Sequence, residues 1–238
     1  MFINPDKTYA EQADRVYTFY DIVGELRDRF GTEETDARKV NLNNIMMAAN
    51  ASIVTLRLMD WTHFQGQDIL TQALRLTKPE YLTFVVDDLL RSSRLFLLLE
   101  SQFQIESLFR NILRELGLSV TQQGYYNVAN SILQHLGIAD LSQKLAILNV
   151  PALMRNSMHA NGIHHGWRGS STSIVIDGIE FKFEHEKKVE CGSWLHIVTA
   201  LKASMKIIEE ILTCTAISSL EVVHDTYSKQ KSTEDRQP

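Results

Sequence analysis

The hydrophobic period of this chain is helical almost throughout and changes only once. Apolar residues recur at intervals of three and four along most of the 238 residues, which is the spacing of an amphipathic helix. In the segment STSIVIDGIEFKFE, residues 171–184, the period becomes two, as in a β-strand with one buried face. We therefore predict an all-α fold: a helical bundle of about five to seven helices with one inserted β-hairpin, at about residues 171–184.

The two strands of this hairpin meet at Asp177-Gly178, a dipeptide that favours a two-residue type I′ turn. Pairing across that turn sets Ile176 opposite Ile179, Ile174 opposite Phe181 and Thr172 opposite Phe183. These side chains form an apolar face, and the alternate positions form a polar one. We expect the apolar face to lie on the helices.

The helices are predicted from apolar stripes bounded by glycine, proline and capping residues. They span residues 6–30, 35–64, 79–116 and 124–136, a segment from residue 140 in which Pro151 restarts the helix, and a last helix from about Ser193. We interpret residues 1–227 as one helical domain, with N-terminal helices in 1–78 and a core in 79–227. The polar tail at 228–238 is predicted to be disordered.

Composition narrows the class of protein. The net charge of −5 and the pI of about 5.9 argue against a general polyanion binder, which carries a basic excess, but they allow a local basic patch. Cys191 and Cys214 are the only cysteines and form no CxxC, so we expect no disulfide framework and a reducing compartment. The N-terminus, MFINPDK, has no secretory signal, and no apolar run is long enough to span a bilayer. We predict a cytoplasmic protein with no membrane segment.

The segment RNSMHANGIHH, residues 155–165, concentrates polar chemistry in a short stretch. Arg155 and His159 are four residues apart, so on a helix they share one face, one turn apart. Asn161-Gly162 supplies the left-handed conformation that ends a helix, which puts His159 in the last turn, where the macrodipole favours a cation. A guanidinium beside an imidazole is suited to an anion such as a phosphodiester.

The surroundings of this segment are poor in acidic residues. Between residues 116 and 176 Asp140 is the only carboxylate, although the protein as a whole is acidic. The same stretch holds cations and aromatic side chains, and aromatic side chains stack on unpaired bases. We predict four RNA contacts in this region: the cations Lys144 and Arg168 and the aromatic rings of Tyr126 and Trp167.

The motif RNSMHANG follows a long helical stretch and precedes a last amphipathic helix, and it resembles the HEPN superfamily (higher eukaryotes and prokaryotes nucleotide-binding domains). Members are helical bundles, commonly homodimers. Many are metal-independent ribonucleases of toxin–antitoxin, phage-defence and RNA-processing systems. Arg155, Asn156 and His159 match the family's signature, and the resemblance extends over roughly residues 79–220.

The resemblance implies a homodimer that binds RNA and cleaves it without a metal or another cofactor, and it implies an antitoxin or other protein partner. Arg155 would hold the scissile phosphate and stabilise charge in the transition state. His159 would move a proton to or from the 2′-hydroxyl or the leaving oxygen, with Asn156 in support. The family usually has four to six residues between the arginine and the histidine, whereas three separate Arg155 from His159.

Two further residues are candidates for supporting roles. Glu106 falls on the apolar side of a long predicted helix, where a lone carboxylate is costly unless it is paired. Its candidate partners are Arg155 or His159, and Arg110, one turn further along its own helix, is the rival. His164 lies beyond the predicted end of the motif helix, in a loop from which it would approach the site.

Other sites are less favoured by the spacing. His159, His164 and His165 lack the helical i,i+4 pair or the cysteines of a zinc site, so we expect no metal. Cys191 lies near His196, and we interpret it as a buried structural cysteine rather than a nucleophile. Two alternatives to a ribonuclease remain: a non-catalytic HEPN-like module that binds a partner protein or a nucleotide, and a helical scaffold whose motif only ends a helix.

Overall fold

The protein is described by a computed structural model, in which residues 8–30, 35–62, 67–78, 80–119 and 124–225 are placed. Within these residues the elements are α1 (Tyr9–Arg27), α2 (Ala37–Trp61), α3 (Gln67–Ala73), α4 (Glu80–Glu115), α5 (Tyr125–His135), α6 (Leu141–His159), β1 (Thr172–Ile176), β2 (Ile179–Phe183), α7 (Trp194–Thr213) and α8 (Thr215–Ser218). The predicted class, an all-α bundle with one β-hairpin, is confirmed. The tail at 228–238 lies outside the described residues.

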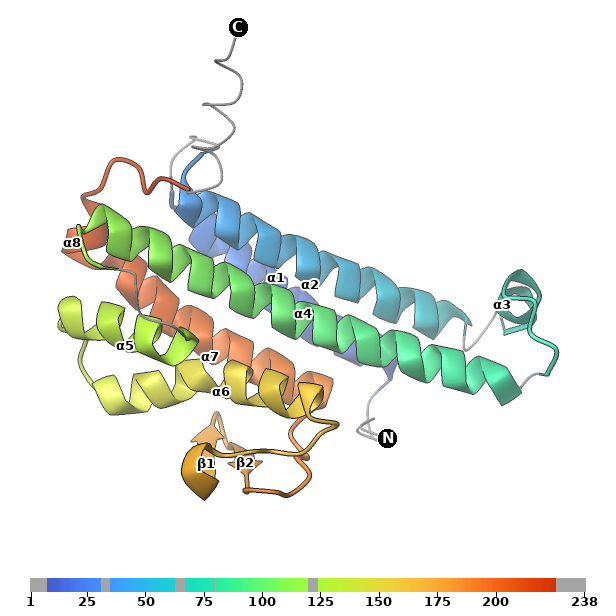
Figure 1. The fold of residues 1–238 in the computed structure, drawn as a ribbon. Coiled ribbons are helices and arrows are strands. Elements are labelled where there is room, and N and C mark those ends of the chain that lie inside the picture. Colours follow the sequence, from blue (N-terminus) through green and yellow to red (C-terminus); the bar gives the residue numbers. More distant parts are fainter. Residues whose placement is uncertain (1–7, 31–34, 63–66, 79, 120–123, 226–238) are drawn as a thin grey trace, which may run out of the picture.

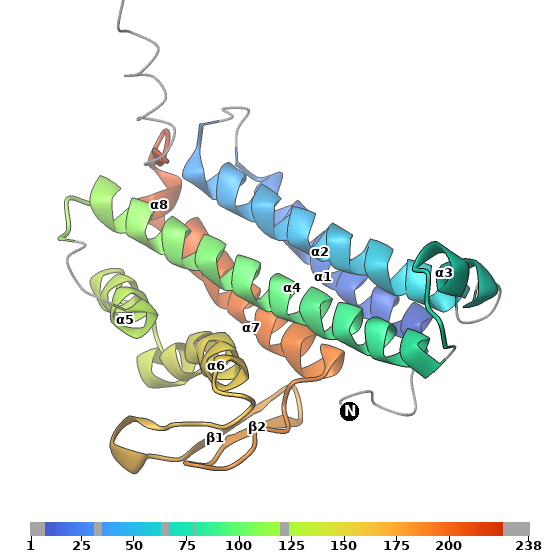
Figure 2. The ribbon, with the colours of Figure 1, turned by 45° about the vertical axis from the view of Figure 1, so that its right-hand side comes forward.

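Four long helices, α1, α2, α4 and α7, run side by side and form the body of the molecule (Figure 1). α1 packs on α2 and α7, and α4 packs on α2 and α7. α5 and α6 lie beneath α4 and α7, and the hairpin lies next to α6 (Figure 2). Buried side chains from all of these elements belong to one hydrophobic core.

The first helix, α1, lies within the predicted range 6–30 but ends three residues earlier, at Arg27. Val16, Phe19 and Val23, three residues of its predicted stripe, are completely buried. Thr8 begins the helix with a capping box: its hydroxyl accepts from the Glu11 N–H, and the Glu11 carboxylate accepts from the Thr8 N–H. Apolar periodicity and capping chemistry therefore agree on where this helix starts and which face it buries.

α6 is one continuous helix rather than two. We predicted that Pro151 restarts the motif helix, but α6 runs from Leu141 to His159 with Pro151 inside it. An interior proline costs a helix about 3 kcal/mol, because it removes a backbone donor. Burial of Leu148 and Met154 on either side of Pro151 offsets that cost, since each buried side chain of this size contributes about 2 kcal/mol.

The β-hairpin has the predicted register, with Thr172 opposite Phe183, Ile174 opposite Phe181 and Ile176 opposite Ile179. Asp177 and Gly178 have φ angles of +49° and +78°, as a type I′ turn requires. Phe181 and Phe183 are completely buried, and the hairpin contacts α6 and α7. The apolar face therefore lies on the helices, beside the helix that carries the motif.

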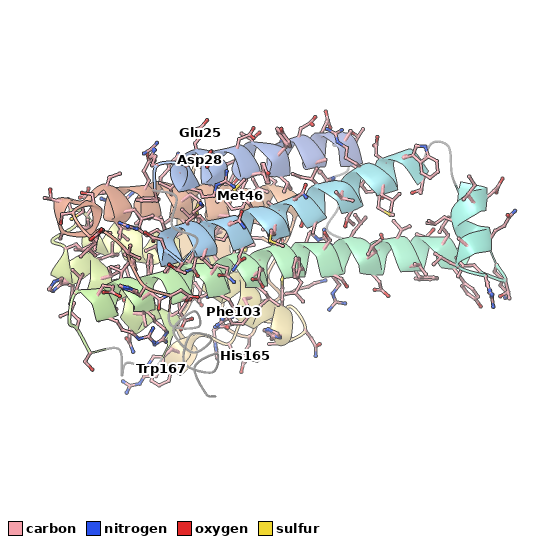
Figure 3. The ribbon with its side chains drawn as sticks, turned by 90° about the horizontal axis from the view of Figure 1, so that it is seen from above. Glu25, Asp28, Met46, Phe103, His165 and Trp167 are labelled. Carbon is pink, nitrogen blue, oxygen red and sulfur yellow. The ribbon has the colours of Figure 1, made fainter. Side chains whose placement is uncertain are left out.

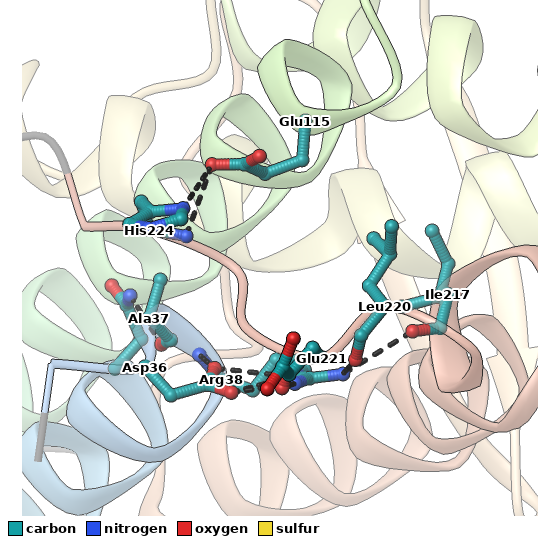
Figure 4. Close-up of polar contacts among 9 residues, drawn as sticks. Asp36, Ala37, Arg38, Glu115, Ile217, Leu220, Glu221 and His224 are labelled. Atoms are coloured by element: carbon teal, nitrogen blue, oxygen red, sulfur yellow. Dashed lines mark hydrogen bonds and ion pairs between the residues drawn. The ribbon is translucent and has the colours of Figure 1, made fainter. Parts of the chain in front are cut away.

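A buried ion pair that the sequence did not predict fixes the chain after α8. The Arg38 guanidinium pairs with the Asp36 carboxylate, and both residues are buried. Arg38 also donates to the carbonyl oxygens of Ile217, Leu220 and Glu221 (Figure 4). One side chain at the start of α2 thus joins α8 and the segment that follows it to the bundle.

The longest helix, α4, has 36 residues and carries charged side chains along its length. Among the described residues, no helix is both long and apolar enough to cross a membrane.

Candidate functional site

The C-terminal end of α6 brings the polar groups of the motif to the surface. His159 is the last residue of α6 and is exposed, and Asn161 and Gly162 follow with φ angles of +56° and +83°. The Gly162 N–H donates to the Ser157 carbonyl oxygen at 2.7 Å, which closes the helix end. The predicted stop signal and the place of His159 in the last turn are confirmed.

Arg155 lies one turn before His159, about 6 Å along the helix axis, and it is partly exposed. Its Nε and Nη2 atoms donate to the side-chain oxygen of Asn156 at 3.2 and 3.0 Å. This contact orients the guanidinium without neutralising it, because an amide carries no charge. No carboxylate in the described part of the chain pairs with Arg155, so its charge remains available to an anion.

Glu106 does not join the motif. Its Oε1 atom accepts from Nε of Arg110 at 3.0 Å and from Nη2 at 2.6 Å. Both residues lie on α4, four positions apart, and they line a groove between α2 and α4. Of the partners that the sequence left open for Glu106, Arg110 is therefore the one with which it pairs, rather than Arg155 or His159.

His164 is buried under the hairpin. Its ring packs against Phe183, with the ring centroids 5.5 Å apart. Its backbone N–H donates to the Lys187 carbonyl oxygen at 3.0 Å, and its own carbonyl oxygen accepts from the Glu186 N–H at 2.7 Å. Burial lowers the pKa of the imidazole, and so does the nearby charge of His185. His164 thus anchors the loop to the segment after the hairpin, in place of the predicted approach to the site.

The loop after His164 folds back on itself at Gly166, where only a glycine fits. The Gly166 N–H donates to Nδ1 of His185 at 3.1 Å. A Cβ atom built on Gly166 would lie 1.7 Å from the Ser170 carbonyl oxygen and 3.2 Å from Nε2 of His164. The backbone therefore approaches itself too closely for any side chain at this position, which fixes the residues that follow the motif.

Trp167 and Arg168 form an exposed turn on this loop. Trp167 is 80% exposed, and the guanidinium of Arg168 lies 5.7 Å from the centroid of its ring. Figure 3 shows Trp167 and His165 at the edge of the molecule opposite Glu25 and Asp28 of α1. An exposed indole beside a cation is suited to stacking on a base next to its phosphate.

The other two predicted RNA contacts, Lys144 and Tyr126, differ in how far their side chains are free to contact RNA. The Lys144 ammonium donates to both carboxylate oxygens of Glu210 on α7, at 2.6 and 2.7 Å. Lys144 also lies in the first turn of α6, roughly 17 Å along the axis from Arg155, so the structure separates it from the motif. Tyr126 lies in the first turn of α5 and is half-exposed.

Cys191 and His196 do not form a nucleophile pair. Burial raises the pKa of the Cys191 thiol to about 11, so little thiolate forms at neutral pH. Nδ1 of His196 instead lies 2.6 Å from Oγ of Ser193, the N-cap of α7. The interpretation of Cys191 as a buried cysteine is confirmed. In the described ranges, no three His, Cys, Asp or Glu side chains come close enough to hold a metal ion.

A cavity next to the end of α6 is the main feature that the sequence did not predict. Met158, Asn161 and Gly162 form part of its wall, and Arg94 of α4 forms another part. The sequence does contain one indication of this cavity. Arg94 lies four residues from Leu98, on the buried face of α4. A helical arginine on an apolar face indicates a partner or a site, as a lone carboxylate does.

Comparison with protein-family models, with curated proteins and with solved structures gives no match to this chain. The resemblance to HEPN proteins therefore stays a prediction.

Proposed function

We propose that this protein is HEPN-like, binds RNA and cleaves it as a metal-independent endoribonuclease, acting as a toxin or phage-defence effector. The observation that carries the proposal is the pair of side chains at the end of α6. Arg155 is held by an uncharged amide oxygen, and it lies one turn from the exposed imidazole of His159. A guanidinium oriented in this way, with its charge not neutralised, is suited to a phosphate.

In the proposed reaction, Arg155 donates to the non-bridging oxygens of the scissile phosphate and stabilises the negative charge of the transition state. His159 takes the proton of the 2′-hydroxyl, and the 2′-oxygen attacks phosphorus. The bond to the 5′-oxygen breaks, and that oxygen takes up a proton from water. The products are a 2′,3′-cyclic phosphate and a 5′-hydroxyl. Asn156 is a positioning residue, because it fixes the orientation of the guanidinium.

The loop after α6 supplies contacts for the rest of the RNA. Trp167 offers an open ring face for a base, and Arg168 offers a cation beside it. Tyr126 offers a second half-exposed ring, on α5. Lys144 contributes less to this surface, since Glu210 already neutralises its charge. The proposed RNA surface is thus centred on the end of α6 and the turn that follows it.

The proposal includes a homodimer, and an exposed apolar stripe supports it. On α2 the stripe holds Met47, Val54, Leu58 and Trp61, and on α4 it holds Leu89, Phe96 and Phe103. The intervals of seven, or of four and three, keep each set on one face of its helix. The Asn44 amide donates to the Gln104 side-chain oxygen across the two helices at 3.2 Å, and the groove there is also lined by Phe103. The two sets thus lie on helices that pack against each other, and Phe103 is the stripe residue that lines this groove.

The area of this stripe matches what a second copy would cover. Half-exposed side chains of this size each leave roughly 100 Å² open, so the seven together offer about 700 Å². A standard interface covers about 800 Å² on each partner. A monomer seldom leaves an apolar patch larger than about 600 Å² open to solvent. We propose that two copies bury this stripe against each other.

A non-catalytic HEPN-like module that binds a partner protein or a nucleotide is the second candidate. Two observations favour it: the net charge of −5, which opposes general affinity for RNA, and the spacing of three residues between Arg155 and His159. In this case Arg155 would still bind a phosphate or a carboxylate of the partner, and His159 would carry out no proton transfer.

The test is incubation of the purified protein with end-labelled RNA in the presence of EDTA, followed by analysis of the product ends. We expect cyclic-phosphate products, and we expect Arg155→Ala and His159→Ala to lower the cleavage rate by about 100-fold or more. His135→Ala is the matched control, because His135 is also the exposed last residue of a helix, α5. We expect this control to cleave RNA at the wild-type rate.

Intact RNA, or cleavage that both motif variants retain, would contradict the ribonuclease proposal. Binding of RNA or of a nucleotide that Arg155→Ala abolishes, without cleavage by the wild type, would favour the second candidate.

A further inference from the structure

A cavity of about 480 Å³ opens where α1, α4, α6 and α7 meet. Its volume is within the range of roughly 300–1,000 Å³ that small-molecule sites occupy. Its lining includes the apolar residues Leu90, Leu95, Met158 and Trp194 and the charged residues Asp87, Asp88, Arg91, Arg94 and Lys188. A cavity lined by both apolar and charged side chains is suited to a ligand that carries both kinds of group.

Arg94 is the most buried of the charged residues that line the cavity. This residue is only 8% exposed, so its guanidinium has lost most of its hydration. Burial lowers its pKa, the neighbouring Asp87 raises it, and the neighbouring Arg91 lowers it. Because an arginine in a protein keeps its proton, the cavity has a permanent and poorly hydrated positive charge in its wall. A poorly hydrated cation binds an anion more strongly than one in water does.

The charges around the cavity favour a dianion. Among the described residues, three cations and two carboxylates line it, which gives this set one net positive charge. α7 begins at Trp194, and both Gly192 and Trp194 line the cavity, so the N-terminal end of this helix contributes roughly half a positive charge more. The sum is close to the charge of roughly −1.5 to −2 that a phosphate monoester carries at neutral pH. A ligand with a carboxylate, which has a single negative charge, matches this positive charge less well than a phosphate monoester does.

We propose that this cavity binds a phosphorylated sugar or a related phosphate ester that carries hydroxyl groups. Its phosphate lies beside Arg91, Arg94 and Lys188. Its hydroxyl groups donate to the carboxylates of Asp87 and Asp88, and its carbon skeleton contacts the apolar side chains of the lining. Inorganic phosphate alone would contact neither the two carboxylates nor these apolar side chains. The site differs from the phosphodiester site proposed at Arg155 and His159, and it does not depend on RNA cleavage.

The probe is ribose 5-phosphate, with ribose and inorganic phosphate as comparison ligands, each titrated into the full chain by calorimetry and by thermal unfolding. We expect ribose 5-phosphate to bind and to raise the unfolding temperature as its concentration increases. We expect ribose and inorganic phosphate to bind at least about tenfold more weakly, because each fills only one part of the cavity. Equal binding of inorganic phosphate and ribose 5-phosphate, or no binding of ribose 5-phosphate, would overturn the proposal.

Two neighbouring lysines give a matched pair of variants. Lys188 lines the cavity, whereas Lys187 pairs with Glu184 and does not line it. Both are exposed, so replacing either side chain by alanine should leave the fold intact. We expect Lys188→Ala to weaken ribose 5-phosphate binding about tenfold, since it removes one charge-assisted contact with the phosphate. Lys187→Ala should leave it unchanged. Equal affinities of the two variants would overturn the assignment of the ligand to this cavity.

Discussion

His164 packs its imidazole against the ring of Phe183, 5.5 Å between centroids, and so joins the loop after the motif to the second strand of the hairpin. Two backbone hydrogen bonds between His164 and residues 186–187 reinforce this junction. The motif and the hairpin, which are adjacent in sequence, are therefore held together by one buried and titratable side chain. The stability of the fold should respond to its protonation.

The first prediction concerns how the stability of the fold depends on pH. Burial lowers the pKa of both His164 and His196 below the ordinary value of 6.5. As the pH falls below about 6.5, the unfolded chain binds these protons before the folded protein does, so the free energy of unfolding decreases. We expect urea denaturation to show this loss between about pH 7 and pH 5. His164→Leu, which keeps an apolar side chain on Phe183, should make the loss smaller. An unchanged slope in this variant would contradict the prediction.

The second prediction concerns the ion pair at the start of α2. Arg38→Met leaves the Asp36 carboxylate buried without its cation and removes the donor to three carbonyl oxygens. Breaking such a pair costs about 3–5 kcal/mol of unfolding free energy. Arg29→Ala is the control, because its pair with Glu209 is about half exposed, and we expect it to cost below about 1 kcal/mol. Urea denaturation of both variants measures the difference, and similar costs would refute it.

The third prediction concerns the loop glycine. In Gly166→Ala the new methyl group would lie 1.7 Å from the Ser170 carbonyl oxygen, so the backbone must move, at a cost of about 2 kcal/mol. Gly192→Ala is the matched control, since its methyl group would lie at an ordinary 3.6 Å from Cε of Met158. We expect a clear fall in melting temperature for Gly166→Ala alone. A fall of the same size in both variants would show that the close approach is not the cause.

The features that the sequence predicted are those that depend on neighbours along the chain. The hairpin register follows from a period of two and the Asp177-Gly178 turn, both of which are local. The end of α6 follows from Gly162, whose positive φ stops a helix whatever lies around it. Pro151 shows the limit of local rules, because packing on both sides of it continued a helix that its ring alone would end.

The features that the sequence did not predict depend on partners that are distant in the chain. The burial of Arg38 is possible because carbonyl oxygens about 180 residues away accept hydrogen bonds from its guanidinium. Arg94 lines a cavity whose other walls come from α1, α6 and α7. Glu106 had a local partner and a distant partner that were equally suitable in sequence, and the local one, Arg110, is the one it contacts. A charged residue on an apolar helix face therefore indicates that it has a partner, but not whether that partner is local or distant.

The last prediction concerns assembly through the apolar stripe of α2 and α4. We expect light scattering to give a particle of about twice the chain mass of 27.2 kDa. Phe96→Glu places a charge at the centre of the α4 stripe and should yield a monomer, because burying an unpaired carboxylate is costly. Phe84→Glu is the matched control: Phe84 is also exposed on α4, but it lies about a third of a turn away from the stripe. A monomeric wild type, or dissociation by both variants alike, would refute the interface.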